Sequence, residues 1–158
     1  MDMHPAIARL YENRLLRTEL ECEQFDRALE GLAGDTEDRI IHEVFRVFDD
    51  ETEQEEVMFG LVHFVESYQM DMYLTQLLES LPAMLEPARD WAIILNKRIL
   101  NDELYRKEYA AIAVGMNDRI KRTLAFLLEE IKEERPRLFE RKVNYILQRL
   151  LNTLQNPD

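Results

Sequence analysis

The amino-acid sequence predicts an all-α protein, a single domain of about eight helices packed as antiparallel hairpins. Its 158 residues include only four glycines and five prolines, so residues that form turns are scarce. Apolar residues recur at the three- and four-residue spacing that is typical of one helix face, whereas the alternation expected of strands is hard to find. The predicted connections are about 2–8 residues long, the range found between antiparallel helices in bundles.

The first three predicted helices begin at recognisable signals. Pro5 suits the first turn of the first helix, and Thr18 with Glu21 forms a capping box for the second. Asp35 or Thr36 can cap the third helix. Their expected core residues are Ile7, Leu10 and Tyr11, then Cys22, Phe25, Leu29 and Leu32, then Ile40, Ile41, Val44, Phe45 and Phe48.

The next two predicted helices follow an acidic stretch. Thr52 and Glu55 form a second capping-box pattern, ahead of a helix that runs to about Tyr68. Asp71 can cap a short helix that Pro82 is expected to close, because proline cannot continue a helix without losing a hydrogen bond.

The remaining helices fill the C-terminal half. Pro87 suits the first turn of one helix, and Asn101 or Asp102 caps the next, which ends near Gly115. A further helix covers about 117–135, and Pro136 starts the final one. The length fits one domain over residues 1–158. A bundle and a short α-solenoid-like stack stay open as alternatives, since no internal repeat is evident.

Composition excludes several classes of function. With 20 lysines and arginines against 32 aspartates and glutamates, the net charge of −12 disfavours binding to nucleic acid. The sequence has no run of about 18 apolar residues, which a membrane span would need. Charges also interrupt the N-terminal segment, where a signal peptide would be apolar. We therefore expect a cytoplasmic protein. The single cysteine, Cys22, excludes an internal disulfide and is expected to be a small buried apolar residue.

The charge is unevenly distributed along the chain. Residues 1–86 contain 6 basic and 21 acidic residues, a net charge of −15, whereas residues 87–158 contain 14 and 11, a net charge of +3. Solubility alone would account for the acidic residues but not for their uneven distribution along the chain. The distribution predicts one strongly negative surface that can steer a basic partner.

The acidic octet DDETEQEE, residues 49–56, can be a metal loop, a helix start or a partner surface. A calcium loop needs a glycine at its sixth position and a glutamate at its twelfth, and these positions hold Gln54 and Gly60. The capping pattern assigns the second half of the octet to a helix start. Asp49, Asp50 and Glu51 then remain as carboxylates that local structure does not explain, and we expect a basic partner to contact them.

Patterns for catalysis or metal binding are missing from the sequence. None of the three histidines follows a glutamate by three residues, as a di-iron bundle requires, and Arg46 stands where HExxH needs its second histidine. No nucleophile, Walker or dinucleotide motif occurs. We expect no enzyme activity, no cofactor and no metal site.

Two segments resemble a known family. The stretch DDETEQEEVMFGLVHFVESY and the later stretch LPAMLEPARDWAIILNKRILND are similar to the all-helical immunity protein family thirty of bacterial polymorphic toxin systems, which include contact-dependent growth inhibition. The resemblance covers roughly residues 48–101. We expect mainly structural roles for five residues in these segments. His63 should form a hydrogen bond at the edge of the core, and Trp91 should pack in the core. Arg98 should pair with a carboxylate, Asn101 should cap the following helix, and Glu66 should also be structural.

The resemblance implies a cytosolic protein that binds and neutralises the toxin encoded beside it. Such toxins are often nucleases, including EndoU-like ribonucleases, whose basic clefts suit an acidic inhibitor. Charge and exposure then suggest the toxin-binding carboxylates Asp49, Asp50, Glu51, Glu53, Glu55, Glu56, Glu37 and Asp38, with Glu19, Glu23 and Asp35 as further candidates. The alternative is an acidic helical adaptor or regulatory module without a toxin partner. An enzyme or metal carrier is the third, least supported class. The sequence leaves the oligomeric state open.

Overall fold

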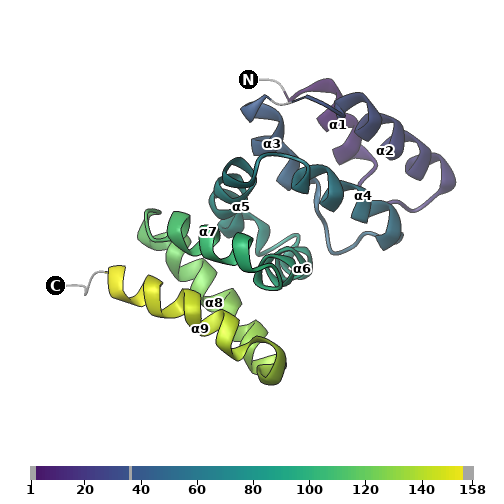
Figure 1. The fold of residues 1–158 in the computed structure, drawn as a ribbon. Helices are drawn as coiled ribbons and strands as arrows, with labels where there is room; N and C mark the ends of the chain where they lie inside the picture. The colour runs from purple at the N-terminus through teal and green to yellow at the C-terminus, as the bar shows by residue number, and fades with distance from the viewer. Residues whose placement is uncertain (1–2, 36, 155–158) are drawn as a thin grey trace.

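The computed structural model describes residues 3–35 and 37–154, and its regular structure in these ranges is entirely helical. This confirms the predicted all-α class. Figure 1 shows the order of the elements, which are α1 (Pro5–Glu12), α2 (Glu19–Leu32), α3 (Asp38–Val44), a short 3₁₀-helix η1 (Phe45–Val47), α4 (Glu55–Glu66), α5 (Met70–Met84), α6 (Arg89–Leu100), α7 (Glu103–Ala113), α8 (Asp118–Glu134) and α9 (Pro136–Thr153).

Helix α5 lies at the centre of the fold. It contacts α3, η1 and α4 on the N-terminal side, and α6, α7 and α8 on the C-terminal side. The hairpin of α1 and α2 lies at one end of the molecule with α4 against α2, and the hairpin of α8 and α9 lies at the other end (Figure 1). The predicted arrangement of helix hairpins in a single domain is confirmed.

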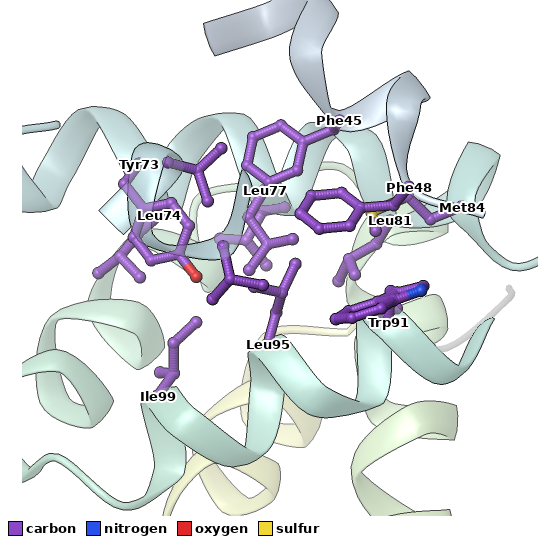
Figure 2. Packing of buried hydrophobic residues seen from close by; sticks show 14 of the residues in the cluster. Phe45, Phe48, Tyr73, Leu74, Leu77, Leu81, Met84, Trp91, Leu95 and Ile99 are labelled. Atoms are coloured by element: carbon purple, nitrogen blue, oxygen red, sulfur yellow. The ribbon is translucent and has the colours of Figure 1, made fainter. Parts of the chain in front are cut away.

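One hydrophobic cluster joins all of these helices. Its centre is aromatic: the ring of Phe48 lies 5.7 Å from that of Trp91, and Phe45 stacks on Tyr73 at 6.3 Å (Figure 2). Trp91 is 3% exposed, so its expected place in the core is correct. Large aromatic side chains contribute strongly to burial, and these rings join η1, α5 and α6 into one body.

Several helix starts differ from the prediction. The hydroxyl of Thr18 accepts a hydrogen bond from the Glu21 amide, so Thr18 caps α2, but the Glu21 carboxylate accepts from the Arg17 amide and the capping box is only half formed. Asp102 rather than Asn101 caps α7. Asp71 lies inside the first turn of α5, and α6 begins two residues after Pro87. The Asp35 carboxylate accepts from the Glu37 amide just before α3, whereas the alternative cap Thr36 lies outside the described residues.

Pro82 does not end α5, which continues to Met84. The proline sits in the last turn of the helix, where its missing N–H and its ring disturb few following residues. Within the described ranges, no helix combines the length and the apolar character needed to cross a membrane.

Candidate functional site

Asp49 is a structural residue, which corrects the expectation that it is free for a partner. It is only 8% exposed, and its carboxylate accepts a hydrogen bond from the Arg14 guanidinium at 3.1 Å and from the Glu51 amide at 2.8 Å. Its main-chain carbonyl accepts from the indole N–H of Trp91 at 3.1 Å. Each of these partners is fixed in the fold, so Asp49 ties the start of the octet to the core.

Asp50 caps a helix that is distant in the sequence. The N-cap position of α6 is Ala88, which has no side-chain acceptor, and the Asp50 carboxylate accepts from the amides of Asp90 and Trp91 at 3.0 and 3.3 Å instead. A negative group there also favours the helix dipole. Burial raises the pKa of the Asp50 carboxyl despite these amides. The view of Asp50 as an unexplained carboxylate is therefore wrong.

The second capping box is also wrong. Thr52 is buried, and its hydroxyl donates to the Arg14 carbonyl at 2.7 Å rather than accepting from α4. The Glu53 amide donates to the Leu15 carbonyl at 2.9 Å, and α4 starts after Gln54 without a side-chain cap. Residues 49–54 thus form an irregular segment that binds the α1–α2 loop, and Glu55 and Glu56 begin α4. The four glutamates of the octet are exposed.

A second acidic row lies on α2, which contacts α4. Glu19, Glu23 and Asp26 are four and three residues apart, so they share one side of that helix. With Gln54 and Val57 they line a groove of about 560 Å³ between α2 and the start of α4. We call this feature the acidic groove. Glu19, Glu23 and Asp26 are the exposed carboxylates that line it, and the exposed glutamates Glu53, Glu55 and Glu56 flank its lining residue Gln54 in the sequence, so we count these six carboxylates with the groove.

The acidic groove also contains one cation, Arg17, which lines it and pairs with Glu21 at 3.0 Å, so the six carboxylates outnumber the basic groups of the groove. No ion pair joins any of the six carboxylates in the part of the chain that the structure describes. Cys22 lies among them, half-buried, and its thiol pKa is raised first by burial and then by Asp26, Glu21 and Glu19. The groove can therefore attract a cationic surface.

Glu37 and Asp38 are exposed but lie elsewhere. Glu37 lies near Tyr68, just past the far end of α4, where it helps to raise the tyrosine pKa. The 12 residues of α4 span about 18 Å, so these two carboxylates are remote from the acidic groove. Glu51 is exposed. Asp26 is the groove residue that the sequence analysis missed, although its spacing from Glu19 and Glu23 could have revealed it.

Motif residues from both family segments form a separate polar cluster. Arg98 makes a two-pronged ion pair with Glu66 at 2.7 and 2.8 Å. Asn101 does not cap α7; its side-chain oxygen accepts from the Lys142 ammonium at 2.8 Å. His63 is not at the edge of the core, since 68% of its side chain is exposed, 3.9 Å from Glu66.

Within the described ranges, no group of three or more histidine, cysteine, aspartate or glutamate side chains is arranged to hold a metal ion. The acidic groove spreads its carboxylates along two helices instead of converging them on a point. This geometry suits several lysines and arginines of a protein surface better than a single cation.

A comparison with known protein families matches the part of the chain that contains these sites. The model of the family described as immunity protein 30 matches residues 12–109, which is more than half of the chain and more than the segments whose resemblance was evident. The match includes the acidic groove and the Glu66–Arg98 pair. No curated protein matches the chain, and no solved structure matches it either. The chain belongs to the immunity protein 30 family.

Proposed function

We propose that this immunity protein neutralises a bacterial toxin domain by forming a stoichiometric complex with it in the cytoplasm. The observation that carries the proposal is the acidic groove, whose six unpaired carboxylates lie inside the region that matches the family. The groove offers solvated negative charge on two rigid helices. A toxin domain with lysines and arginines at its active site would be attracted to this surface and covered by it.

The toxin class that fits this surface best is a nuclease, with EndoU-like ribonucleases as one candidate. A nuclease must hold a phosphate backbone, so its cleft is positively charged. An inhibitor that presents carboxylates to this cleft competes for the same basic groups and gains association rate from long-range attraction. Inhibition of this kind needs neither a catalytic residue nor a cofactor on the inhibitor.

The contact set that we propose is centred on Glu19, Glu23, Asp26, Glu53, Glu55 and Glu56, with Glu51 at its margin. Asp49 and Asp50 are left out because their carboxylates are committed to Arg14 and to the start of α6. Glu37 and Asp38 are secondary candidates, since they lie beyond the opposite end of α4.

Co-expression tests this proposal. The chain is produced together with the C-terminal domain encoded by the adjacent toxin gene, and we expect growth to be rescued and an equimolar complex to be purified. The control replaces Glu133 and Glu140, exposed residues of α8 and α9 outside the family match, by lysine. Rescue should survive this control and fail when Glu23 and Asp26 are replaced in the same way. Continued toxicity with the unaltered chain would contradict the proposal.

A further inference from the structure

The exposed side of α9 carries a row of basic side chains. Arg137, Arg141, Tyr145 and Arg149 follow one another at four-residue intervals, so they lie along one side of the helix over about 18 Å. We call these four residues the arginine row. Its three arginines are exposed, Tyr145 is half-buried, and the exposed Leu138 lies beside them. Figure 1 shows α9 at the opposite end of the molecule from α1 and α2.

The charges of the arginine row are not neutralised within the fold. No ion pair joins any of its three arginines in the ranges that the structure describes. The glutamates of the neighbouring helix α8 mostly pair with cations outside the row, in the pairs Lys132–Glu129, Arg89–Glu130 and Lys97–Glu134. The arginine row is therefore a positive surface without a counter-charge of its own.

The composition of the arginine row is typical of a protein interface. Arginine and tyrosine are enriched at interfaces, because both combine a large contact area with hydrogen-bonding groups. The Arg149 guanidinium is held over the Tyr145 ring, 3.5 Å from its centre, and donates to the Tyr145 carbonyl at 2.7 Å. The family match ends at residue 109, before α8 and α9 begin. The arginine row thus lies outside the region on which the proposed toxin contact rests.

The acidic side of α2 matches the arginine row in charge and in spacing. Glu19, Glu23 and Asp26 line the acidic groove, and the exposed Glu30 continues their side of the helix, so α2 presents carboxylates over about 16 Å. The single basic residue of α2, Arg27, lies to one side of these carboxylates. The first two carboxylates have the same four-residue spacing as the first two arginines of the arginine row. A second copy of the chain therefore offers a surface complementary to this row.

We propose that two copies of the chain pair when no toxin is bound, each placing its arginine row against the acidic groove of the other. The two surfaces lie at opposite ends of the molecule, so two copies in opposite orientation can bring each positive end against a negative end (Figure 1). Such a two-fold pair closes, as most soluble homo-oligomers do. An anionic membrane would also attract the arginine row, but it would repel the rest of a chain whose net charge is −12.

The proposed pair also has a consequence for the toxin. A toxin domain that binds the acidic groove would have to displace the second copy, because both use the same carboxylates. The groove would then be covered in the free protein and exposed only to a partner that competes for it. This displacement rests on the proposed function, whereas the pairing itself does not.

Sedimentation equilibrium of the isolated protein tests the pairing. At low ionic strength the average mass should rise with concentration above the 18.9 kDa of one chain and level off at twice that mass. At high salt it should return to the mass of one chain, since salt screens the charges. Arg137→Glu with Arg141→Glu should raise the dissociation constant of the pair about tenfold. The matched control, Arg119→Glu with Arg122→Glu, makes the same change of charge at exposed positions of α8 and should leave the average mass unchanged.

A charge exchange then identifies the two surfaces. Glu23→Lys with Asp26→Lys reverses charges in the acidic groove, and Arg137→Glu with Arg141→Glu reverses them in the arginine row, so each variant alone should pair poorly. An equal mixture restores opposite charges at both contacts and should pair again. A mixture that does not pair would overturn the inference. An unaltered chain that keeps the mass of one chain at low salt would also overturn it, whether or not that chain binds phosphatidylserine vesicles. Because these measurements include no toxin, the pairing can fail while the proposed function stands.

Discussion

Replacement of Asp50 by alanine tests whether a carboxylate 40 residues away holds the start of α6. In the structure, Asp50 supplies the acceptor that the N-cap residue Ala88 lacks, and it binds the amides of Asp90 and Trp91. Asp50→Ala leaves these two amides without their acceptor. The bond from the Trp91 indole to the Asp49 carbonyl stays in place, so the change tests the carboxylate alone.

The expected loss follows from the geometry. Loss of a helix cap costs about 0.5–2 kcal/mol, and hydrogen bonds to a charged group lie at the upper end of the usual range. The Trp91 amide is 3.3 Å away, a long bond, and solvent can reach the cap after truncation. We therefore expect Asp50→Ala to lower the free energy of unfolding by about 1–2 kcal/mol, or the melting temperature by about 2–8 °C. Because burial raises the Asp50 pKa, Asp50→Asn should cost less.

Urea unfolding measures this loss, followed by the fluorescence of Trp91, the only tryptophan, and by far-ultraviolet circular dichroism. The control is Glu51→Ala, because Glu51 is adjacent, acidic and exposed, and surface substitutions of this kind usually change stability by less than about 0.5 kcal/mol. If Asp50→Ala and Glu51→Ala unfold at the same urea concentration, the assignment of Asp50 as a helix cap is refuted.

Two further predictions concern the aromatic residues. Trp91→Ala should lower the free energy of unfolding by about 3–5 kcal/mol because it empties a site packed by Phe48 and Phe59; an unchanged melting transition together with lost toxin binding would move Trp91 to the interface. Burial, and then the charges of Asp35 and Glu37, raise the pKa of Tyr68 from its ordinary 10.0 to about 12. Between these two pH values the folded state keeps a proton that the unfolded state loses, so the stability of the protein falls as the pH rises. Tyr68→Phe should reduce that fall by about 1.4 kcal/mol per pH unit, and urea unfolding at stepped alkaline pH would show an unchanged slope if this assignment is wrong.

The helical class was predictable because it depends on local periodicity. Apolar spacing placed each helix, and Thr18 capped α2 as its neighbours indicated. Where the prediction erred, a distant partner decided the outcome: Thr52 bonds to Arg14 instead of to its own helix, and Asp50 caps α6. A capping motif indicates which local groups a side chain can bind. In the folded protein, Thr52 and Asp50 instead bind groups that are distant in the sequence.

The candidate site was predictable only in its overall charge. The excess of acidic residues before residue 87 indicated a negative surface, but two of its strongest candidates, Asp49 and Asp50, proved to be structural. The pairing of α2 with α4, which builds the acidic groove, is a long-range contact that no local pattern encodes.

The association rate with the toxin domain tests the central claim most directly. Glu23→Lys with Asp26→Lys changes the net charge by the same amount as Glu133→Lys with Glu140→Lys, but only the first pair lies in the acidic groove. Stopped-flow measurements over a range of ionic strength should show the groove pair associating about ten- to a hundredfold more slowly at low salt, with the difference shrinking as salt rises. The distant pair should stay close to the unaltered chain, and equal slowing by both pairs would contradict docking through the acidic groove.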